Sequence, residues 1–217
     1  MHHAARAGDE CQNPDGPTAR RRGGRIGVRE DKKRDTRARL ERAALELFAG
    51  RGYERTTVED VAARAGVSAR TAFRYFPAKA DLVFGDAGPD LEALRGHLAA
   101  QDRSIPAIEA TRAALGEFSL RIGTPINAER TRVVAASPTL TARALEVREL
   151  WAEAIAAELA ARRKLEAPDE RARLGGLLIV AILVSAVREW SNSDGHPRAL
   201  RQAVDRTALW AVEILRP

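Results

Sequence analysis

The sequence predicts an all-α fold in which a small three-helix unit precedes a larger helical bundle, with about nine helices in total. No part of the 217 residues shows the strict alternation of apolar and polar residues that is typical of strands. Apolar residues instead recur three and four positions apart, which is the spacing of one helix face. Glycine and proline residues divide this pattern into segments of helical length.

Composition indicates a soluble globular protein, because 45% of the residues are hydrophobic and 30% are charged. Cys11 is the only cysteine, so one chain forms neither a disulfide framework nor a cysteine-rich zinc site. The longest apolar run, 174–187, is shorter than the roughly 20 residues of a membrane span, and the first residues lack the apolar core of a signal peptide. We therefore expect a cytoplasmic protein that is not inserted in a membrane.

Residues 1–34 are expected to form a disordered basic arm. They lack helical periodicity and contain few apolar residues, so burial would not offset the entropy lost on ordering. Residues 1–39 contain eleven Lys and Arg against six Asp and Glu, which is +5 of the total net charge of +6. Two interpretations remain open: an arm with sequence-independent affinity for phosphates, or a solvated tail.

A first helix is predicted from Asp35 to Gly50 or Gly52, at the start of a first domain that comprises residues 35–84. Its inner face carries Leu40, Ala44, Leu47 and Phe48. We expect this face to cover the two shorter helices that follow, and so to complete a three-helix unit.

A second helix is predicted to begin at Val58, because Thr57 and Asp60 form the sequence pattern of a capping box, in which each side chain binds the backbone N–H of the other residue. Its apolar stripe consists of Val58, Val61, Ala62 and Ala65. Gly66 is expected to end the helix in the left-handed conformation, with Val67 folding back on the stripe. The chain thus turns a sharp corner.

A third helix is predicted from Ala69 to Phe76, capped by Ser68 and ended by Pro77. Ala72 and Phe76, four residues apart, can pack inward. The residues left on the outer side or its flanks are Arg70, Thr71, Phe73, Arg74 and Tyr75. No acidic residue occurs in this segment, so its outer side is expected to be cationic.

A short basic helix after a capped, tight turn is typical of a DNA-reading element, because Arg forms bidentate bonds to guanine while Lys, Thr and Tyr bind phosphates. We predict that Arg70, Thr71, Phe73 and Arg74 lie near bases. The other residues predicted to bind DNA, mainly at phosphates, are Arg37, Thr57, Ser68, Tyr75 and Lys79. The alternative is an ordinary helical hairpin whose charges are solvated.

At these residues the chain resembles the tetracycline-repressor (TetR) family of transcriptional regulators, whose helix-turn-helix ends in a pattern like T-x-[FY]-x-[YH]-F-x-x-K. The matching residues are Thr71, Phe73, Tyr75, Phe76 and Lys79. The resemblance covers residues 36–84 and implies a dimeric DNA-binding regulator. Two positions depart from the family: Phe73 lacks the tyrosine hydroxyl that many members bring to a phosphate, and Ala72 is smaller than the usual leucine.

The second predicted domain, 85–217, is richer in alanine and leucine, and prolines divide it into longer helices. A short helical stretch, 78–84, precedes it. The expected helices are 90–100, 106–122, 128–136, 140–164, 169–191 and 198–215. Gly175 and Gly176 lie inside one of them, where glycine permits close helix packing.

The last two helices predict a homodimer. The segment 174–187 is apolar nearly all round, which fits burial on two sides. The final helix sets Leu200, Val204, Ala208, Ala211 and Leu215 on one stripe. A four-helix bundle made by two chains would bury both, and its two-fold symmetry would match DNA half-sites about 34 Å apart. The alternative is that both helices form the core of a monomer.

A ligand cavity is expected between the long helices, with apolar walls and arginines at its mouth. The candidates are Phe118, Ile122, Leu145, Trp151, Leu183, Val187 and Trp190, with Arg132, Arg148 or Arg188 as the charged residues. Each residue taken alone is equally well explained by an ordinary core or surface position.

The segment 129–151, followed by Arg188-Glu189-Trp190, resembles the C-terminal domain of mycofactocin regulators and other actinobacterial members that bind acyl-CoA-like ligands. This resemblance implies a small hydrophobic effector, with its acyl chain between the long helices and an arginine on its phosphates. Such an effector must bind one conformation more tightly than the other. We expect a repressor; an activator and a regulator without a small effector are the alternatives.

The sequence lacks recognisable catalytic constellations. The histidines occupy positions 2, 3, 97 and 196, none in an H-E-x-x-H spacing, and neither a G-x-S-x-G motif nor a phosphate-binding glycine loop occurs. We expect no enzyme activity, no cofactor and no metal site. A rival class is a lipid- or acyl-binding helical protein with only non-specific DNA affinity.

Overall fold

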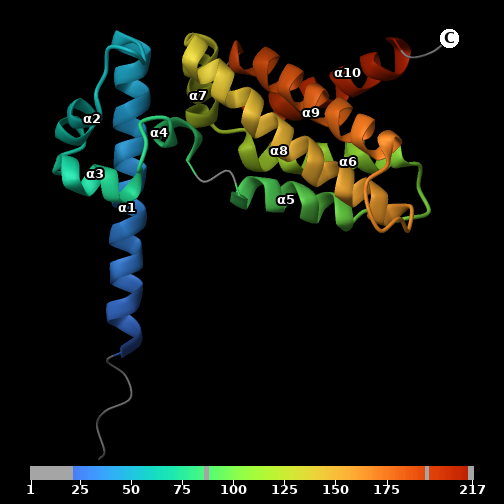
Figure 1. Cartoon of the computed structure of the whole chain (residues 1–217), viewed down its shortest axis with the longest axis horizontal. Coiled ribbons are helices and arrows are strands. Elements are labelled where there is room, and N and C mark those ends of the chain that lie inside the picture. The colour runs from blue at the N-terminus through green and yellow to red at the C-terminus, as the bar shows by residue number, and fades with distance from the viewer. Residues whose placement is uncertain (1–21, 86–87, 194–195, 215–217) are drawn as a thin grey trace, which may run out of the picture. The chain divides into compact units, whose positions relative to one another are not determined.

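The computed structural model describes residues 22–85, 88–193 and 196–214. Over these ranges the chain forms ten helices and no strand (Figure 1), so the all-α prediction is confirmed. The first helices are α1 (Arg22–Arg51), α2 (Val58–Arg64), α3 (Ala69–Tyr75) and α4 (Asp81–Phe84). The others are α5 (Gly88–Ala99), α6 (Ala107–Ile122), α7 (Pro125–Ala135), α8 (Pro138–Arg162), α9 (Glu170–Ser191) and α10 (Pro197–Ile214).

The first helix begins earlier than the sequence predicts. Residues 22–34, expected to be disordered, belong to α1, while residues 1–21 of the expected arm lie outside the described part of the chain. Side chains 30–35 are exposed, so residues 30–35 are helical without burial. Its Arg, Lys and Glu residues favour helix, and Arg34 forms an ion pair with Asp31 one turn away. The prediction of disorder is wrong here, because charged residues with good helix propensity form helix even where few side chains are apolar.

Residues 37–217 form one compact unit, in which α2 and α3 have the predicted caps. The Thr57 N–H donates to Asp60 Oδ2 at 2.9 Å, and the Asp60 N–H donates to Thr57 Oγ1 at 3.1 Å, which completes the capping box. Gly66 has a φ of 68°, in the left-handed region, and the Val67 N–H donates back to the Ala62 carbonyl at 3.0 Å. Hydrogen bonds therefore fix the corner between α2 and α3.

A buried apolar cluster holds the helix-turn-helix to α1. As predicted, Leu40, Ala44 and Phe48 of α1 are buried in it, and so are Ala72 and Phe76 below α3. Val133 of α7 and Leu140 of α8 belong to the same cluster. The core of the first predicted domain therefore continues into the second.

Replacing Thr57 by alanine is expected to lower the free energy of unfolding by about 1 kcal/mol, because the Asp60 N–H at the start of α2 loses its partner. Urea unfolding followed by circular dichroism measures this change. Thr57→Ser keeps an accepting hydroxyl and is expected to stay within about 0.5 kcal/mol of the wild-type value. Equal losses in the two variants would contradict the capping role.

Helices α5 to α10 enclose a second core. Helix α8 runs beside α9, and α10 contacts both α6 and α9 (Figure 1). The large buried side chains of this core include Leu94, Phe118, Ile155, Leu183, Trp190 and Leu200. This core supports the walls of the cavities described below.

Three helices begin at prolines that mark breaks in the sequence pattern, so the predicted starts are late. They begin at Pro125, Pro138 and Pro197, and Thr124 and Ser137 cap the first two through their side chains. Proline is tolerated in the first turn because its missing N–H would have no partner inside the helix. At these three positions proline is the first residue of a helix, and not only a break between two helices.

Helix α9 has two apolar faces. Its inner face is buried in the core, whereas Leu174, Leu177 and Leu178 expose 58%, 49% and 37% of their surface. Among the described helices, α9 alone has the length and apolar content of a membrane span, and its buried side is that of a core helix. The structure buries one side of α9, and burial of the other side stays a prediction.

The apolar stripe of α10 faces the chain's own core. Leu200, Val204 and Ala208 are buried there, and Leu215 lies beyond the described residues. The sequence predicted that this stripe packs against a partner chain. In the structure α6 and α9 of the same chain cover it, so it is buried within one chain. The large apolar side chains that α10 exposes are Leu209 and Trp210, at 57% and 51%.

Candidate functional site

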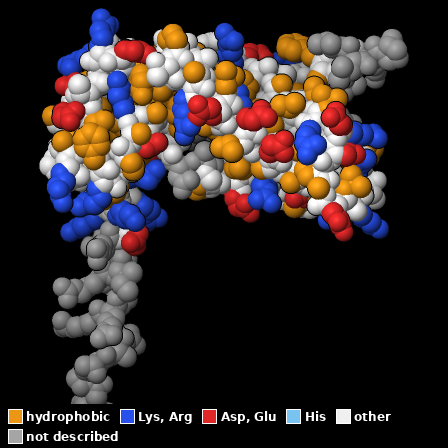
Figure 2. Space-filling view, viewed as in Figure 1, with side chains coloured by type: hydrophobic (Ala, Val, Ile, Leu, Met, Phe, Trp, Pro, Cys, Tyr) orange, Lys and Arg blue, Asp and Glu red, His pale blue; other side chains and the backbone are white. Residues whose placement is uncertain are grey.

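The outer surface of α3 presents basic and aromatic side chains. Ala72 and Phe76 are buried beneath it, while Arg70 and Arg74 are exposed and Phe73 exposes 42% of its surface. On the visible face, this part of the molecule shows apolar side chains together with Lys and Arg side chains (Figure 2). Because α3 contains no acidic residue, its outer surface attracts anions.

The hydroxyl groups beside this surface serve as helix caps. Ser68 Oγ accepts from the Thr71 N–H at 3.2 Å and lies 3.0 Å from Thr71 Oγ1. Thr57 caps α2 in the same way. The half-buried Tyr75 packs against the Arg74 guanidinium, 5.4 Å from the ring centre. Five of the residues predicted to bind DNA thus take part in local interactions.

Lys79 follows α3 and is positioned by the loop after α1. Its Nζ lies 4.1 Å from the centre of the Tyr53 ring and donates to the Glu54 carbonyl at 3.5 Å. Partial burial lowers the pKa of Lys79, and the negative charge of Glu54 opposes this change. An ammonium group has three donors, so the remaining ones can bind a phosphate.

Arg37 is placed differently from the other predicted DNA contacts. Its Nε donates to Glu41 Oε1 at 3.2 Å, and its guanidinium lies 4.7 Å from the centre of the Phe76 ring. A phosphate would have to compete with both interactions. Its role at DNA stays a prediction.

A cavity of about 460 Å³ lies among α7, α8 and α9. Residues predicted for a ligand site that line it are Ile122, Arg148, Trp151, Leu183 and Val187. Arg188, one of the candidate mouth residues, lines it too. The volume lies within the range of about 300–1,000 Å³ that is usual for small-molecule sites. The arrangement can hold an apolar molecule beside cationic groups.

Four other predicted residues do not line this cavity. Phe118 is fully buried, with its ring 5.8 Å from that of Trp151 in edge-to-face contact. Leu145 is 57% exposed, and the Arg132 guanidinium donates to a backbone carbonyl at the end of α9. Trp190, also a candidate, is buried in the core. Periodicity identifies an apolar helix face but leaves open which neighbour that face meets.

Sequence reasoning missed Arg130. The lining residues that it did not identify are Phe84, Arg130, Thr131, Val134, Ala135, Thr141, Val147, Val180 and Val184. Burial lowers the pKa of Arg130, against the opposing effects of the Glu41 and Asp90 carboxylates. The four-residue spacing of Arg130 and Val134, which puts both on one helix face, was an available signal, but only the packing of α7 shows that this face meets the cavity.

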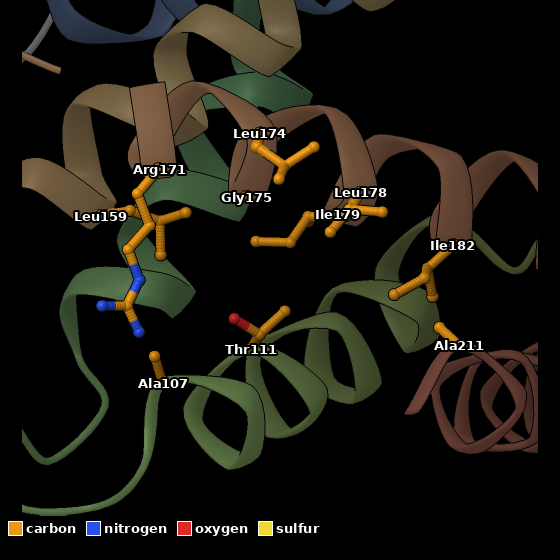
Figure 3. Close-up of a pocket in the computed structure, with 10 residues that line it drawn as sticks. All are labelled: Ala107, Thr111, Leu159, Arg171, Leu174, Gly175, Leu178, Ile179, Ile182 and Ala211. Atoms are coloured by element: carbon orange, nitrogen blue, oxygen red, sulfur yellow. The ribbon is translucent and has the colours of Figure 1, made fainter. Parts of the chain in front are cut away.

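A second cavity, of about 520 Å³, lies between α6, α8, α9 and α10 (Figure 3). Leu174 and Leu178 border it on α9, opposite Thr111 and Ala107 on α6, and the Arg171 side chain reaches towards Ala107. The two leucines are among the three that α9 exposes. This cavity therefore belongs to the outer face of α9 and not to the predicted ligand site.

Two family models match the chain. The model described as "Bacterial regulatory proteins, tetR family" matches residues 41–85, and the model described as "MftR C-terminal domain" matches residues 105–209. The first match contains α2 and α3, and the second contains most of the lining of the 460 Å³ cavity. These are models of transcriptional regulators and not of enzymes.

Two curated relatives are similar over most of the chain. MftR of Mycobacterium tuberculosis, a mycofactocin biosynthesis transcriptional regulator, is 31% identical over 153 residues, which is 70% of this chain and 77% of MftR. The HTH-type transcriptional regulator TcmR of Streptomyces glaucescens is 31% identical over 213 residues, 94% of this chain and 92% of TcmR. Both relatives are transcriptional regulators.

A solved structure shares the fold. FadR of Thermus thermophilus, a TetR-family repressor in complex with lauroyl-CoA, has a TM-score of 0.50 and 21% identity, over 83% of this chain and 95% of that chain. At this identity the likeness concerns the fold alone.

Proposed function

This chain belongs to the TetR family of bacterial transcriptional regulators, and on that premise we propose that it is a cytoplasmic repressor. It binds a palindromic operator as a homodimer through residues 35–84, and it binds a small hydrophobic effector and its partner through residues 85–217. The observation that carries the proposal is the exposed, acid-free surface of α3 beside a hydrogen-bonded turn.

Helix α3 is proposed to enter the major groove. Arginine can bind guanine through two hydrogen bonds, and Phe73 can contact a thymine methyl group. The residues proposed near bases are Arg70, Thr71, Phe73 and Arg74. The residues proposed at phosphates are Thr57, Ser68, Tyr75 and Lys79, together with Arg37 once its guanidinium leaves Glu41.

The exposed apolar residues of the last two helices support dimerisation. Helix α9 exposes Leu174 and Leu177, and α10 exposes Leu209 and Trp210. A second copy would bury these half-exposed side chains, and each leucine would contribute about half of the roughly 1.5–3 kcal/mol gained when a fully exposed leucine is buried. Two-fold symmetry would present two copies of α3 to half-sites one DNA turn apart.

The 460 Å³ cavity is the proposed effector site. Its walls are apolar, and its charged lining residues are arginines. An acyl-CoA-like effector fits both features, and the complex of Thermus thermophilus FadR with lauroyl-CoA is a precedent for that ligand class on the same fold. Such an effector releases the operator when it binds the DNA-incompetent conformation more tightly than the competent one.

Selection of bound sequences from a random DNA duplex pool, at physiological salt, tests the proposal. The full chain is expected to enrich a two-fold symmetric consensus, because a dimer meets two equivalent half-sites. A chain with Arg70, Arg74 and Lys79 all replaced by alanine is the control and is expected to enrich no consensus.

Enrichment without a consensus would contradict the regulator mechanism and favour an acyl-binding protein with non-specific DNA affinity. The enriched duplex then serves as the probe for effectors. Operator release by acyl-CoA supports a repressor, whereas tighter binding in its presence would contradict derepression.

A further inference from the structure

Arg130 occupies the wall between two cavities. It lines the apolar cavity of about 460 Å³ and also a polar cavity of about 340 Å³, whose other charged residues are Arg37, Glu41 and Asp90. Its Nη2 lies 3.6 Å from Glu41 Oε2, and its Nη1 donates to the Asn127 side chain. Its buried Nε has no hydrogen-bond partner among the described residues. A guanidinium with an unsatisfied buried N–H can take a further anionic partner.

Glu41 connects Arg130 to the helix-turn-helix. Its Oε1 accepts from Arg37 Nε at 3.2 Å, and the Arg37 guanidinium lies 4.7 Å from the centre of the Phe76 ring. Phe76 caps the end of α3 and is buried. A continuous series of contacts therefore runs from the wall of the apolar cavity to the end of the proposed recognition helix.

The charge of the apolar cavity favours one class of ligand. Arg130, Arg148 and Arg188 line it, and none of its described lining residues is acidic. Moving an anion out of water costs free energy unless a cation and hydrogen bonds receive it. An apolar chain that ends in an anionic group, carboxylate or phosphate, complements this lining.

We propose that Arg130 senses the effector: the anionic end of an apolar ligand binds its guanidinium, replaces Glu41 as its partner, and so alters the support that Glu41 and Arg37 give to α3. This inference rests on the proposed function, because it requires an effector in the 460 Å³ cavity. The 3.6 Å separation of Arg130 and Glu41 indicates a weak ion pair, so the exchange is easily reversed. Because both anions compete for one cation, weakening either contact strengthens the other.

Calorimetry on the full chain tests the ligand contact with three probes that share one acyl chain: dodecanoate, methyl dodecanoate and dodecanoyl-CoA. Arg130→Gln is expected to weaken dodecanoate binding about 10-fold or more, because a charge-assisted hydrogen bond is lost. Binding of the uncharged methyl ester is expected to change less than about threefold, since only packing holds it. If Arg130→Gln weakens dodecanoyl-CoA binding by the same factor, a phosphate can also supply the anion that Arg130 binds. If it weakens only dodecanoate binding, the anion is the free carboxylate.

Glu41→Gln tests transmission to α3. Removing the competing carboxylate is expected to tighten dodecanoate binding by about two- to fivefold, the usual worth of a partly exposed ion pair. The effect of dodecanoate on operator affinity is expected to shrink to less than about twofold, because the effector no longer displaces a charged partner. A variant that merely loosened the fold would weaken ligand binding, so the two explanations differ in sign.

Ser137→Ala is the matched control for Glu41→Gln. The Ser137 hydroxyl donates to the Glu54 carboxylate at 2.8 Å, which links α8 to the loop after α1 without touching the cavity. This bond also lowers the pKa of Glu54. The control is expected to keep the dodecanoate affinity and the operator response of the wild-type chain.

Two further variants locate the anion. Arg148→Gln removes another arginine of the cavity, and a loss of dodecanoate affinity as large as that of Arg130→Gln would overturn the assignment to Arg130. Arg130→Lys keeps the positive charge and is expected to lose less dodecanoate affinity than Arg130→Gln. This difference would show that the lost affinity reflects the lost charge and not misfolding. Thermal melts of both Arg130 variants check that they fold.

The outcomes separate this inference from the proposed function. The sensing role is overturned if Arg130→Gln binds dodecanoate as tightly as the wild type, or if Glu41→Gln keeps the full operator response. Neither result contradicts the proposal that the protein is a transcriptional regulator. If the wild-type chain binds a symmetric operator but none of the three probes, the result contradicts both the sensing role of Arg130 and the proposed class of effector. If it binds dodecanoate but no specific DNA, the regulator proposal fails, and the Arg130→Gln result still decides the ligand contact.

Discussion

Gly176→Ala is expected to lower the free energy of unfolding by about 2 kcal/mol and the melting temperature by roughly 4–8 °C. A Cβ atom at this position would lie 2.2 Å from the Ala152 carbonyl oxygen and 3.2 Å from the Ala156 backbone nitrogen. Backbone atoms cannot rotate away as a side chain can, so α8 and α9 must separate. The greater helix propensity of alanine, about 1 kcal/mol, offsets only part of this cost.

Gly175→Ala is the matched control, since it makes the same change one residue earlier in α9. A Cβ there would meet Leu159 Cδ1 at 2.7 Å, and that atom is the end of a flexible side chain. The variant is therefore expected to be as stable as the wild type, or more stable by up to about 1 kcal/mol. Differential scanning calorimetry compares the two variants, and equal melting temperatures would contradict the backbone contact at Gly176.

Arg70→Ala is expected to weaken binding to the preferred operator by about 1–3 kcal/mol and to relax base choice where Arg70 meets the DNA. The side chain is exposed on α3, and the Ser68 cap fixes the start of that helix. Fluorescence anisotropy with the selected operator and its single-base variants measures both effects. Arg95→Ala, at an exposed position on α5, is expected to change neither. Undiminished base discrimination by Arg70→Ala would contradict the proposed docking of α3.

Lys79→Ala provides the contrasting result. A phosphate contact does not depend on sequence, so affinity is expected to fall by a similar factor on every duplex. The slope of log affinity against log salt is expected to flatten by about one. Because Lys79 also contacts the Tyr53 ring, a thermal melt must show that the variant still folds. A loss restricted to certain bases would place Lys79 at a base edge instead.

Local sequence was enough to predict the helix-turn-helix. The capping box at Thr57 and Asp60, the cap at Ser68 and the left-handed Gly66 each depend on atoms within about four residues of one another. These patterns predicted the residues at which the two capped helices begin. Burial of Ala72 followed equally from its position on the helix.

Local rules also explain two errors of prediction. Residues 30–34 form helix without burial, because helix propensity and the ion pair of Arg34 with Asp31 suffice there. Pro125 and Pro138 begin helices, since the first turn has no hydrogen bond for proline to break.

The sequence by itself determined which residues form helices and which faces are apolar, because both properties depend on near neighbours. Only the tertiary structure decided which neighbour each face meets. It buries Leu200 and Val204 of α10 in the chain's own core, and it turns Arg130 rather than Arg132 towards the cavity. It also brings Glu41, 89 positions away in the chain, to 3.6 Å from Arg130. Contacts between distant segments depend on how whole helices pack, and helical periodicity contains no information about that choice.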